Sequence, residues 1–392
     1  MEKRTDFEIE RDRIQGEIAA LEGNALSAPV DRQKAVKFVY LLFQRASLGG
    51  NLAEFDAVDA AILCAIEHLG PLPELYFLRA NLDLKLHRVA RARRDLEMSP
   101  GLQDSVQGKA LMVDLDFQEG RYEGALKACE RVVQQNRTWD NLARFAYLKA
   151  KMGDAAAAEQ LYIEAEDELT AKEMQQFAWV EIQRGLLHLV HGRYDEARVH
   201  YERSGRAYSG YWLIDEHMAE LLGAQGQFEE AVALYKKVIE RLPRPEFQQA
   251  LGELYLFMGQ PAEARPWFEE ALTGYLDSVR RGEVHYYHHL VDFYADVIKN
   301  GAEALQWARK DLDLRENFST QAALAWALYR AEQYSEALET IQKALASGVK
   351  DSHMFYRAGM IHLSAGRTEE GNRDLHLVSE INPHYRNFHV HR

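Results

Sequence analysis

The chain has 392 residues, of which 47% are hydrophobic and 28% are charged. Its 61 acidic and 47 basic residues give a formal net charge of −14, which disfavours nucleic acid as a partner because phosphate binding needs a concentrated basic face. No stretch approaches 18 uninterrupted apolar residues, so we expect no membrane insertion.

Residues 1–30 form the first segment in chain order. The apolar residues Phe7, Ile9, Ile14, Ile18 and Leu21 predict a short amphipathic helix that ends at Gly23, and a linker follows it. We expect this helical segment to cap the first repeat; the alternative is that it docks a partner. The first 13 residues alternate acids and bases without an apolar run, which argues against a signal peptide, and the chain has only two cysteines. The sequence therefore predicts a cytoplasmic protein.

A short signature recurs nine times in the rest of the chain. Successive copies are 33 to 40 residues apart, and a period near 34 indicates a helical solenoid of two-helix units. Each copy is centred on one small residue, and these residues are Ala92, Ala125, Ala158, Ala197, Ala231, Ala264, Ala304, Ala337 and Gly371.

Three positions around this small residue have predictable roles. Five residues before it, six copies carry a glycine, which suits a tight turn between two helices; His87, Lys299 and Glu332 are the exceptions. Twelve residues before it most copies carry another small residue, which predicts a close helix crossing. Four residues after it nearly every copy has an apolar side chain, on the same helix face as the small residue.

One copy carries these positions most clearly, with Leu251, Gly252, Tyr255, Gly259, Ala264, Phe268 and Ala271. In this pattern the chain resembles the tetratricopeptide repeat (TPR) family over residues 72–383. A degenerate first repeat is expected at 31–71 and a tail at 384–392. The resemblance implies an all-α, right-handed superhelical solenoid of about nine to ten TPR-like helix–turn–helix units.

Two repeat intervals are stretched to 39 and 40 residues. The additions fall within 164–177 and 274–284, which are charged and contain no proline, and therefore favour longer helices. The nine prolines are expected at the boundaries between units and not inside helices.

A search for catalytic motifs along the chain finds no phosphate loop, nucleophile elbow or zinc-protease motif, so we expect no enzyme, no cofactor and no metal. One cluster runs from His285 to His289 and is followed by Asp292. On a helix, His285, His288 or His289, and Asp292 would share one side, with the spacing of metal ligands. We interpret these residues as polar and aromatic groove residues, and metal binding is the alternative.

The resemblance also implies that the first helices of the units line a concave groove. Aromatic and arginine side chains there suit protein recognition because they bury area at low entropic cost and pair with carboxylates. The candidate groove residues are Arg144, Tyr147, Trp179, His285, His288, Asp292, Trp326, Tyr329, Arg330, Tyr356 and Arg357.

These features favour a non-catalytic scaffold or adaptor that binds a peptide or protein partner in the concave groove. One alternative is a peptide-responsive sensor that controls another protein. A second is an accessory metal-handling protein that uses the His285–His289 cluster. The sequence leaves open the partner and the oligomeric state.

Overall fold

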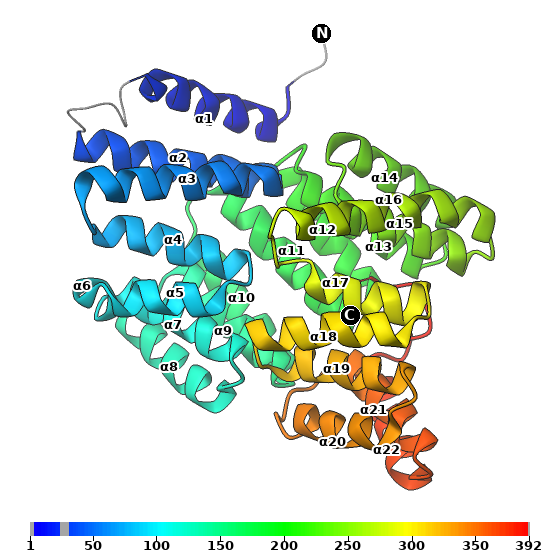
Figure 1. Cartoon of the computed structure of the whole chain (residues 1–392). Coiled ribbons are helices and arrows are strands. Elements are labelled where there is room, and N and C mark those ends of the chain that lie inside the picture. The colour runs from blue at the N-terminus through cyan, green and yellow to red at the C-terminus, as the bar shows by residue number, and fades with distance from the viewer. Residues whose placement is uncertain (1–3, 24–30, 391–392) are drawn as a thin grey trace. The chain divides into compact units, whose positions relative to one another are not determined.

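The computed structural model describes residues 4–23 and 31–390, and this part of the chain is helical with no strand. The chain forms two compact units. Unit 1 comprises Met1–Leu115 with Tyr208–Tyr211, and unit 2 comprises Asp116–Ala207 with Trp212–Arg392. Within each unit, consecutive helices pack in antiparallel pairs (Figure 1), which confirms the all-α solenoid of helix–turn–helix units.

Unit 1 begins with the predicted amphipathic helix. Thr5 caps this helix in a capping box with Glu8, and its apolar side chains Phe7, Ile14 and Ile18 are buried. The predicted linker at 24–30 lies outside the described residues. The helices of unit 1 are α1 (Asp6–Glu22), α2 (Arg32–Gly49), α3 (Leu52–Leu69), α4 (Pro73–Lys85), α5 (Val89–Glu97), α6 (Pro100–Gln103) and most of α7 (Val106–Gln118).

Unit 2 contains the pairs α9 with α10, α11 with α12, α13 with α14, α15 with α16, α19 with α20, and α21 with α22. Its elements are α8 (Tyr122–Gln135), α9 (Trp139–Lys151), α10 (Ala155–Asp167), α11 (Met174–Val190), α12 (Tyr194–Ala207), α13 (Trp212–Ala224), α14 (Phe228–Arg241), α15 (Pro245–Phe257), α16 (Pro261–Arg280), α17 (Tyr287–Asp292), the π-helix η1 (Phe293–Val297), α18 (Gly301–Leu314), α19 (Phe318–Arg330), α20 (Tyr334–Leu345), α21 (Ser352–Ser364) and α22 (Thr368–Ile381).

The turn between the two helices of a repeat has a residue with left-handed backbone conformation at the predicted position. The six glycines expected there all have φ between 69° and 89°. The three exceptions, His87, Lys299 and Glu332, are the only non-glycine residues with positive φ in the described part of the chain, at 58° to 62°. The turn geometry is therefore retained even where the glycine is lost.

The helix crossings also lie where the small residues predict them. A Cβ atom added at Gly252 would lie 2.7 Å from the Phe268 ring, and one added at Gly185 would lie 2.2 Å from the Tyr201 ring. In both pairs the glycine stands twelve residues before the central alanine and the aromatic residue four after it. The absence of a side chain on the first helix makes room for the ring of the second.

The stretched intervals lengthen helices, as expected. Helix α11 has 17 residues and α16 has 20, whereas most other helices of unit 2 have 12 to 14. The proline expectation was wrong at one position, because Pro266 lies inside α16. It stands in the second turn of that helix, close to the start, where few intrahelical hydrogen bonds precede it.

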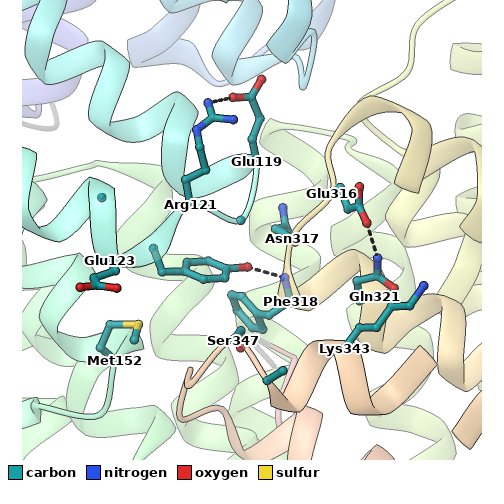
Figure 2. A pocket seen from close by; sticks show the side chains of 14 residues that line it. Glu119, Arg121, Glu123, Met152, Glu316, Asn317, Phe318, Gln321, Lys343 and Ser347 are labelled. Carbon is teal, nitrogen blue, oxygen red and sulfur yellow. Dashed lines mark hydrogen bonds and ion pairs between the residues drawn. The ribbon is translucent and has the colours of Figure 1, made fainter. Parts of the chain in front are cut away.

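The first helices of unit 2 are in contact with the segments that precede α19 and α21. The Asn317 side-chain amide donates to the Gln118 carbonyl at 3.0 Å, and the Lys350 N–H donates to the Lys151 carbonyl at 2.9 Å. The Tyr122 hydroxyl accepts from the Phe318 N–H. Tyr122 lines a cavity of about 740 Å³ between α8 and the segment that precedes α19. Figure 2 shows this cavity with Arg121, Asn317 and Phe318 among the residues that line it. The contact closes the solenoid of unit 2, so its helices surround a common interior.

Candidate functional site

The interior of unit 2 contains a cavity of about 490 Å³, here called the inner chamber. It is lined mainly by α13, α15, α17, α19 and α21, which are the first helices of successive pairs, so it lies on the concave side of the solenoid. The residues that line it are Trp212, Leu213, Glu216, Arg244, Glu246, Phe247, Gln249, Glu253, His288, His289, Asp292, Asp311, Ser319, Ala323, His353, Arg357 and Val390.

Charged groups of both signs face the inner chamber. At one side, Glu246 forms an ion pair with Arg244 and accepts a hydrogen bond from the Tyr286 hydroxyl at 2.7 Å. Burial alone would raise the pKa of Glu246, but the charges of Arg244 and His289 and the hydrogen bonds to its carboxylate together lower this pKa below the usual value. At another side, buried Arg357 forms an ion pair with Asp292. The chamber wall is therefore polar and charged at neutral pH.

The described part of the tail, residues 384–390, lies against the helices that line the chamber. The Asn387 side chain donates to the Ala224 carbonyl at 2.9 Å, and the Val390 N–H donates to the Glu220 carboxylate. The Phe388 side chain is only 4% exposed. Its ring packs edge-on against Phe257, with 6.0 Å between the ring centroids, and it fills the space that Gly223 leaves open.

Five of the predicted groove residues stand on α19 and α21 and form contacts within the protein: Trp326, Tyr329, Arg330, Tyr356 and Arg357. The Trp326 indole donates to both Asp296 carboxylate oxygens at 3.1 Å and stacks on Tyr329. The Arg330 guanidinium donates to the Ala295 carbonyl at 2.8 Å. Among these five, only Arg357 lines the inner chamber. The other four, including Tyr356, form packing contacts between repeats.

The predicted residues at the other end of unit 2 lie apart from the inner chamber. Arg144 donates to Asn141 at 2.9 Å, and Trp179 packs edge-on against Trp139 in an apolar core cluster. Tyr147 lines two smaller cavities, of about 150 Å³ and 240 Å³.

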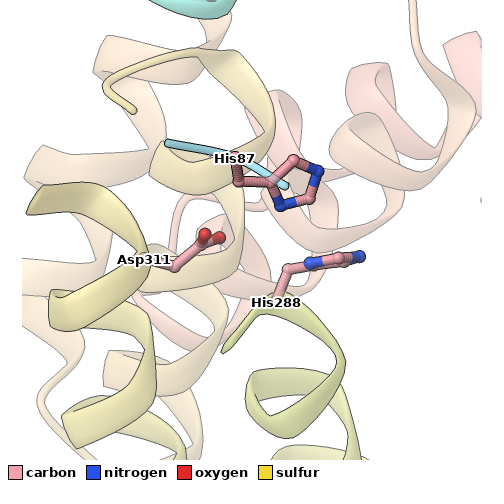
Figure 3. A group of neighbouring side chains, drawn as sticks. All are labelled: His87, His288 and Asp311. Carbon is pink, nitrogen blue, oxygen red and sulfur yellow. The ribbon is translucent and has the colours of Figure 1, made fainter. Parts of the chain in front are cut away.

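The histidine cluster is divided by the start of a helix. Helix α17 begins at Tyr287, so His285 lies in the preceding turn and does not continue the helical spacing on which the metal alternative depended. His285 is buried, which lowers its pKa to about 4, and its Nε2 atom has no hydrogen-bond partner. Within the described residues, His285, His288 or His289, and Asp292 do not form a three-ligand group. His288 instead lies beside Asp311 of α18, with ligand atoms within 4.8 Å (Figure 3).

Two features of the site were not identified from the sequence. Arg244 and Glu246 flank Pro245 at the start of α15, where helical periodicity does not indicate which way a side chain points. The contacts of Phe388 lie in a segment outside the repeat pattern, and its aromatic side chain beside Val390 was the only available signal.

A family model described as tetratricopeptide repeat matches residues 218–278 and 322–371. The chain contains tetratricopeptide repeats in these two regions. The matched residues cover most of α13–α16 and α19–α22, and proteins of this family generally serve as scaffolds for protein–protein interaction. No helix of this TPR protein, within the described residues, is both long and apolar enough to span a membrane.

Each of two relatives is similar in sequence to only part of this chain. The TPR repeat-containing protein YpiA of Bacillus subtilis (strain 168) is 26% identical over 178 residues, which are 44% of this chain and 40% of YpiA. The human protein O-mannosyl-transferase TMTC2 is 33% identical over 67 residues, or 16% of this chain and 8% of TMTC2. The chain thus matches less than half the length of either relative.

Two solved structures are also similar. The crystal structure of the APC/C hetero-tetramer Cut9–Hcn1 matches 96% of this chain and 79% of that chain, with 16% identity and a TM-score of 0.43. The crystal structure of a tetratricopeptide repeat protein from Parabacteroides merdae ATCC 43184 matches 62% of this chain and 93% of that chain, with 17% identity and a TM-score of 0.38.

Proposed function

We propose that the protein is a non-catalytic cytoplasmic scaffold that binds an extended peptide segment of a partner protein in the interior of unit 2. The observation that carries this proposal is the position of the tail. A non-helical segment of the chain already lies against α13 and α15, so these helices have a surface that accepts non-helical polypeptide.

The contacts of the tail describe the kind of segment that fits. Its aromatic ring occupies the space beside Gly223 and Phe257, and a backbone N–H two residues later is held by the Glu220 carboxylate. Buried aromatic anchors typically dominate the free energy of peptide recognition. The preferred partner segment therefore has an aromatic residue followed by a free main-chain donor, and His288, Asp292 and Arg357 of the inner chamber contact the residues beyond it.

The same observation favours the sensor alternative. A partner segment that binds at α13 and α15 must first displace the tail, so binding changes what the tail contacts. Because the tail is tethered, it competes at a high effective concentration and makes the site responsive only to partners that bind more tightly.

The proposal is tested with a fluorescent synthetic peptide of residues 382–392. The full chain with Phe388→Ala should bind this peptide more tightly than the wild-type chain does, since the anchor of its own tail is lost. A peptide in which Phe388 is replaced by Ala is the matched control, and it should bind neither protein. Equal, weak anisotropy changes for both peptides with both proteins would refute the proposal.

A further inference from the structure

Three potential metal ligands converge where α10, α11 and α12 of unit 2 pack together. Glu159 of α10, His188 of α11 and His200 of α12 each offer one ligand atom, and these atoms all lie within 4.8 Å of one another. The two histidines are 8% and 6% exposed, and their rings are stacked with 5.1 Å between centroids. Two imidazoles and one carboxylate, contributed by three different helices, have the composition of a three-ligand zinc site.

The atoms needed for coordination are left available by the surrounding contacts. The Oε2 atom of Glu159 is buried and has no hydrogen-bond partner, and it lies 3.7 Å from Nε2 of His188. Two ligand atoms of a tetrahedral zinc ion, each at ~2.05 Å from the metal, are about 3.3 Å apart, so this pair needs only a small adjustment. An unsatisfied buried carboxylate oxygen is costly unless something binds it.

Hydrogen-bond partners hold two of the three ligands, His200 and Glu159. Nδ1 of His200 lies 2.9 Å from the Glu181 carboxylate, an arrangement that leaves Nε2 of the ring for a metal. The other Glu159 oxygen accepts a hydrogen bond from Arg184 at 3.1 Å, which holds the carboxylate in its orientation. The charged groups packed around the ligands are Glu166, Glu181, Arg184 and Arg203, and with Glu159 the carboxylates outnumber the guanidinium groups.

The ligand Glu159 also forms the open side of the cluster. Its side chain is 24% exposed, whereas the histidine side chains are 10% and 8% exposed. An ion can therefore enter from this side, and water can complete a fourth coordination position there.

We propose that Glu159, His188 and His200 form a binding site for one divalent transition-metal ion of the zinc class. Imidazole and carboxylate ligands suit Zn²⁺, and Co²⁺ reports the same geometry by its visible absorption. This site is separate from the inner chamber, because none of its three residues lines that cavity. Its location in the contact between two repeats assigns the ion a role in joining α10 to the pair α11–α12.

The chain provides a matched control for this proposal. His362 and Asp374 are twelve residues apart, as His188 and His200 are, and both pairs occupy the same positions of their repeats. His362 is also buried, and its Nδ1 atom lies 2.6 Å from the Asp374 carboxylate. His362 is absent from the three-ligand groups of the described residues, so His362→Ala removes an equivalent histidine without removing a metal ligand.

The test titrates untagged full-length protein with Zn²⁺ in competition with a chromophoric chelator. Wild type and His362→Ala should each bind one tight zinc ion, and Glu159→Gln and His200→Ala should weaken it at least about tenfold, since even a second-shell loss typically costs 10–100-fold. The Co²⁺ spectrum should change in the same two variants.

Circular dichroism checks that each variant is folded. Glu159→Gln, at the partly exposed ligand, decides the matter should His200→Ala fail to fold. Absence of a saturable zinc ion in wild type, or equal affinity in wild type and Glu159→Gln, would overturn the proposal.

Discussion

At the scale of single residues, the glycines at the helix crossings are the most sensitive positions of the fold. Replacing Gly252 by alanine places a methyl group 2.7 Å from the Phe268 ring, so one of the two helices must move. We expect Gly252→Ala to lower the free energy of unfolding by about 1–3 kcal/mol, as overpacking typically does. Thermal unfolding followed by circular dichroism measures this loss.

The control for this substitution is Gly124→Ala in α8 of the same unit. Gly124 is exposed, and an added Cβ atom would meet nothing within 4 Å. Because alanine favours the helix over glycine, this variant should be stabilised by up to about 1 kcal/mol. Opposite signs for the two substitutions are expected; a loss of equal size at both positions would show that the crossing is misplaced.

The burial of His285 predicts that the free energy of unfolding depends on pH. Burial lowers its pKa from the ordinary value of 6.5 to about 4, although Glu246 and Glu283 partly oppose this shift. Between pH 6.5 and pH 4 the unfolded chain therefore binds a proton that the folded chain excludes, so the contribution of His285 is present above pH 6.5 and is lost as pH falls toward 4. The 2.5-unit difference corresponds to about 3 kcal/mol.

Urea unfolding at a series of pH values measures this contribution. The variant His285→Gln should show a flatter decline of stability between pH 6.5 and pH 4 than the wild-type protein does. An identical slope in both proteins would mean that His285 is not buried as a neutral group.

At the scale of single elements, the N-terminus of α19 has two functions. The Asn317 carbonyl oxygen of the side chain accepts from the backbone N–H groups of Ser319 and Thr320, and its amide donates to the Gln118 carbonyl. Asn317→Ala therefore removes both a helix cap and a contact between α19 and the distant end of α7. We expect a loss of about 2–3 kcal/mol, from about 1 for the cap and about 1–2 for the hydrogen bond.

Asp154 caps α10 by accepting from the Ala157 N–H, and no hydrogen bond from its side chain to a distant repeat accompanies this cap in the described structure. Asp154→Ala should cost only about 1 kcal/mol. Chemical denaturation of both variants compares them, and equal losses would argue that the contact with Gln118 contributes nothing.

The elements themselves could be predicted well from the sequence, because they depend on local patterns. The repeat positions located the turns, including the three where His87, Lys299 and Glu332 replace glycine, and the charged insertions indicated longer helices. The interruption of α17 by the π-helix could not be predicted in this way, since both forms satisfy the same apolar periodicity. The late start of α17, at Tyr287, leaves His285 outside the helix that carries the rest of the histidine cluster.

At the scale of the whole molecule, a repeat pattern specifies only contacts between neighbouring units. It therefore predicted helices that line a groove but not that Asn317 would reach Gln118 or that the tail would lie on α13 and α15. For the same reason it placed Trp326 and Tyr329 in the groove, although they pack between repeats. Arg357, which stands on the first helix of its pair, lines the inner chamber.

The tail packs Phe388 against Phe257 on the interior surface of unit 2, and the proposed function depends on this contact. The most direct measurement is disulfide cross-linking in the full chain that carries Ala224→Cys and Asn387→Cys together, because this pair leaves Phe388 in place. The Asn387 side chain donates to the Ala224 carbonyl at 2.9 Å, so the two introduced thiols are within reach of each other. We expect mild oxidation to join these two positions within one chain, as detected by mass spectrometry of proteolytic fragments, and either single substitution to give no such product. Two thiols that both remain fully reactive to alkylation after oxidation would contradict the account.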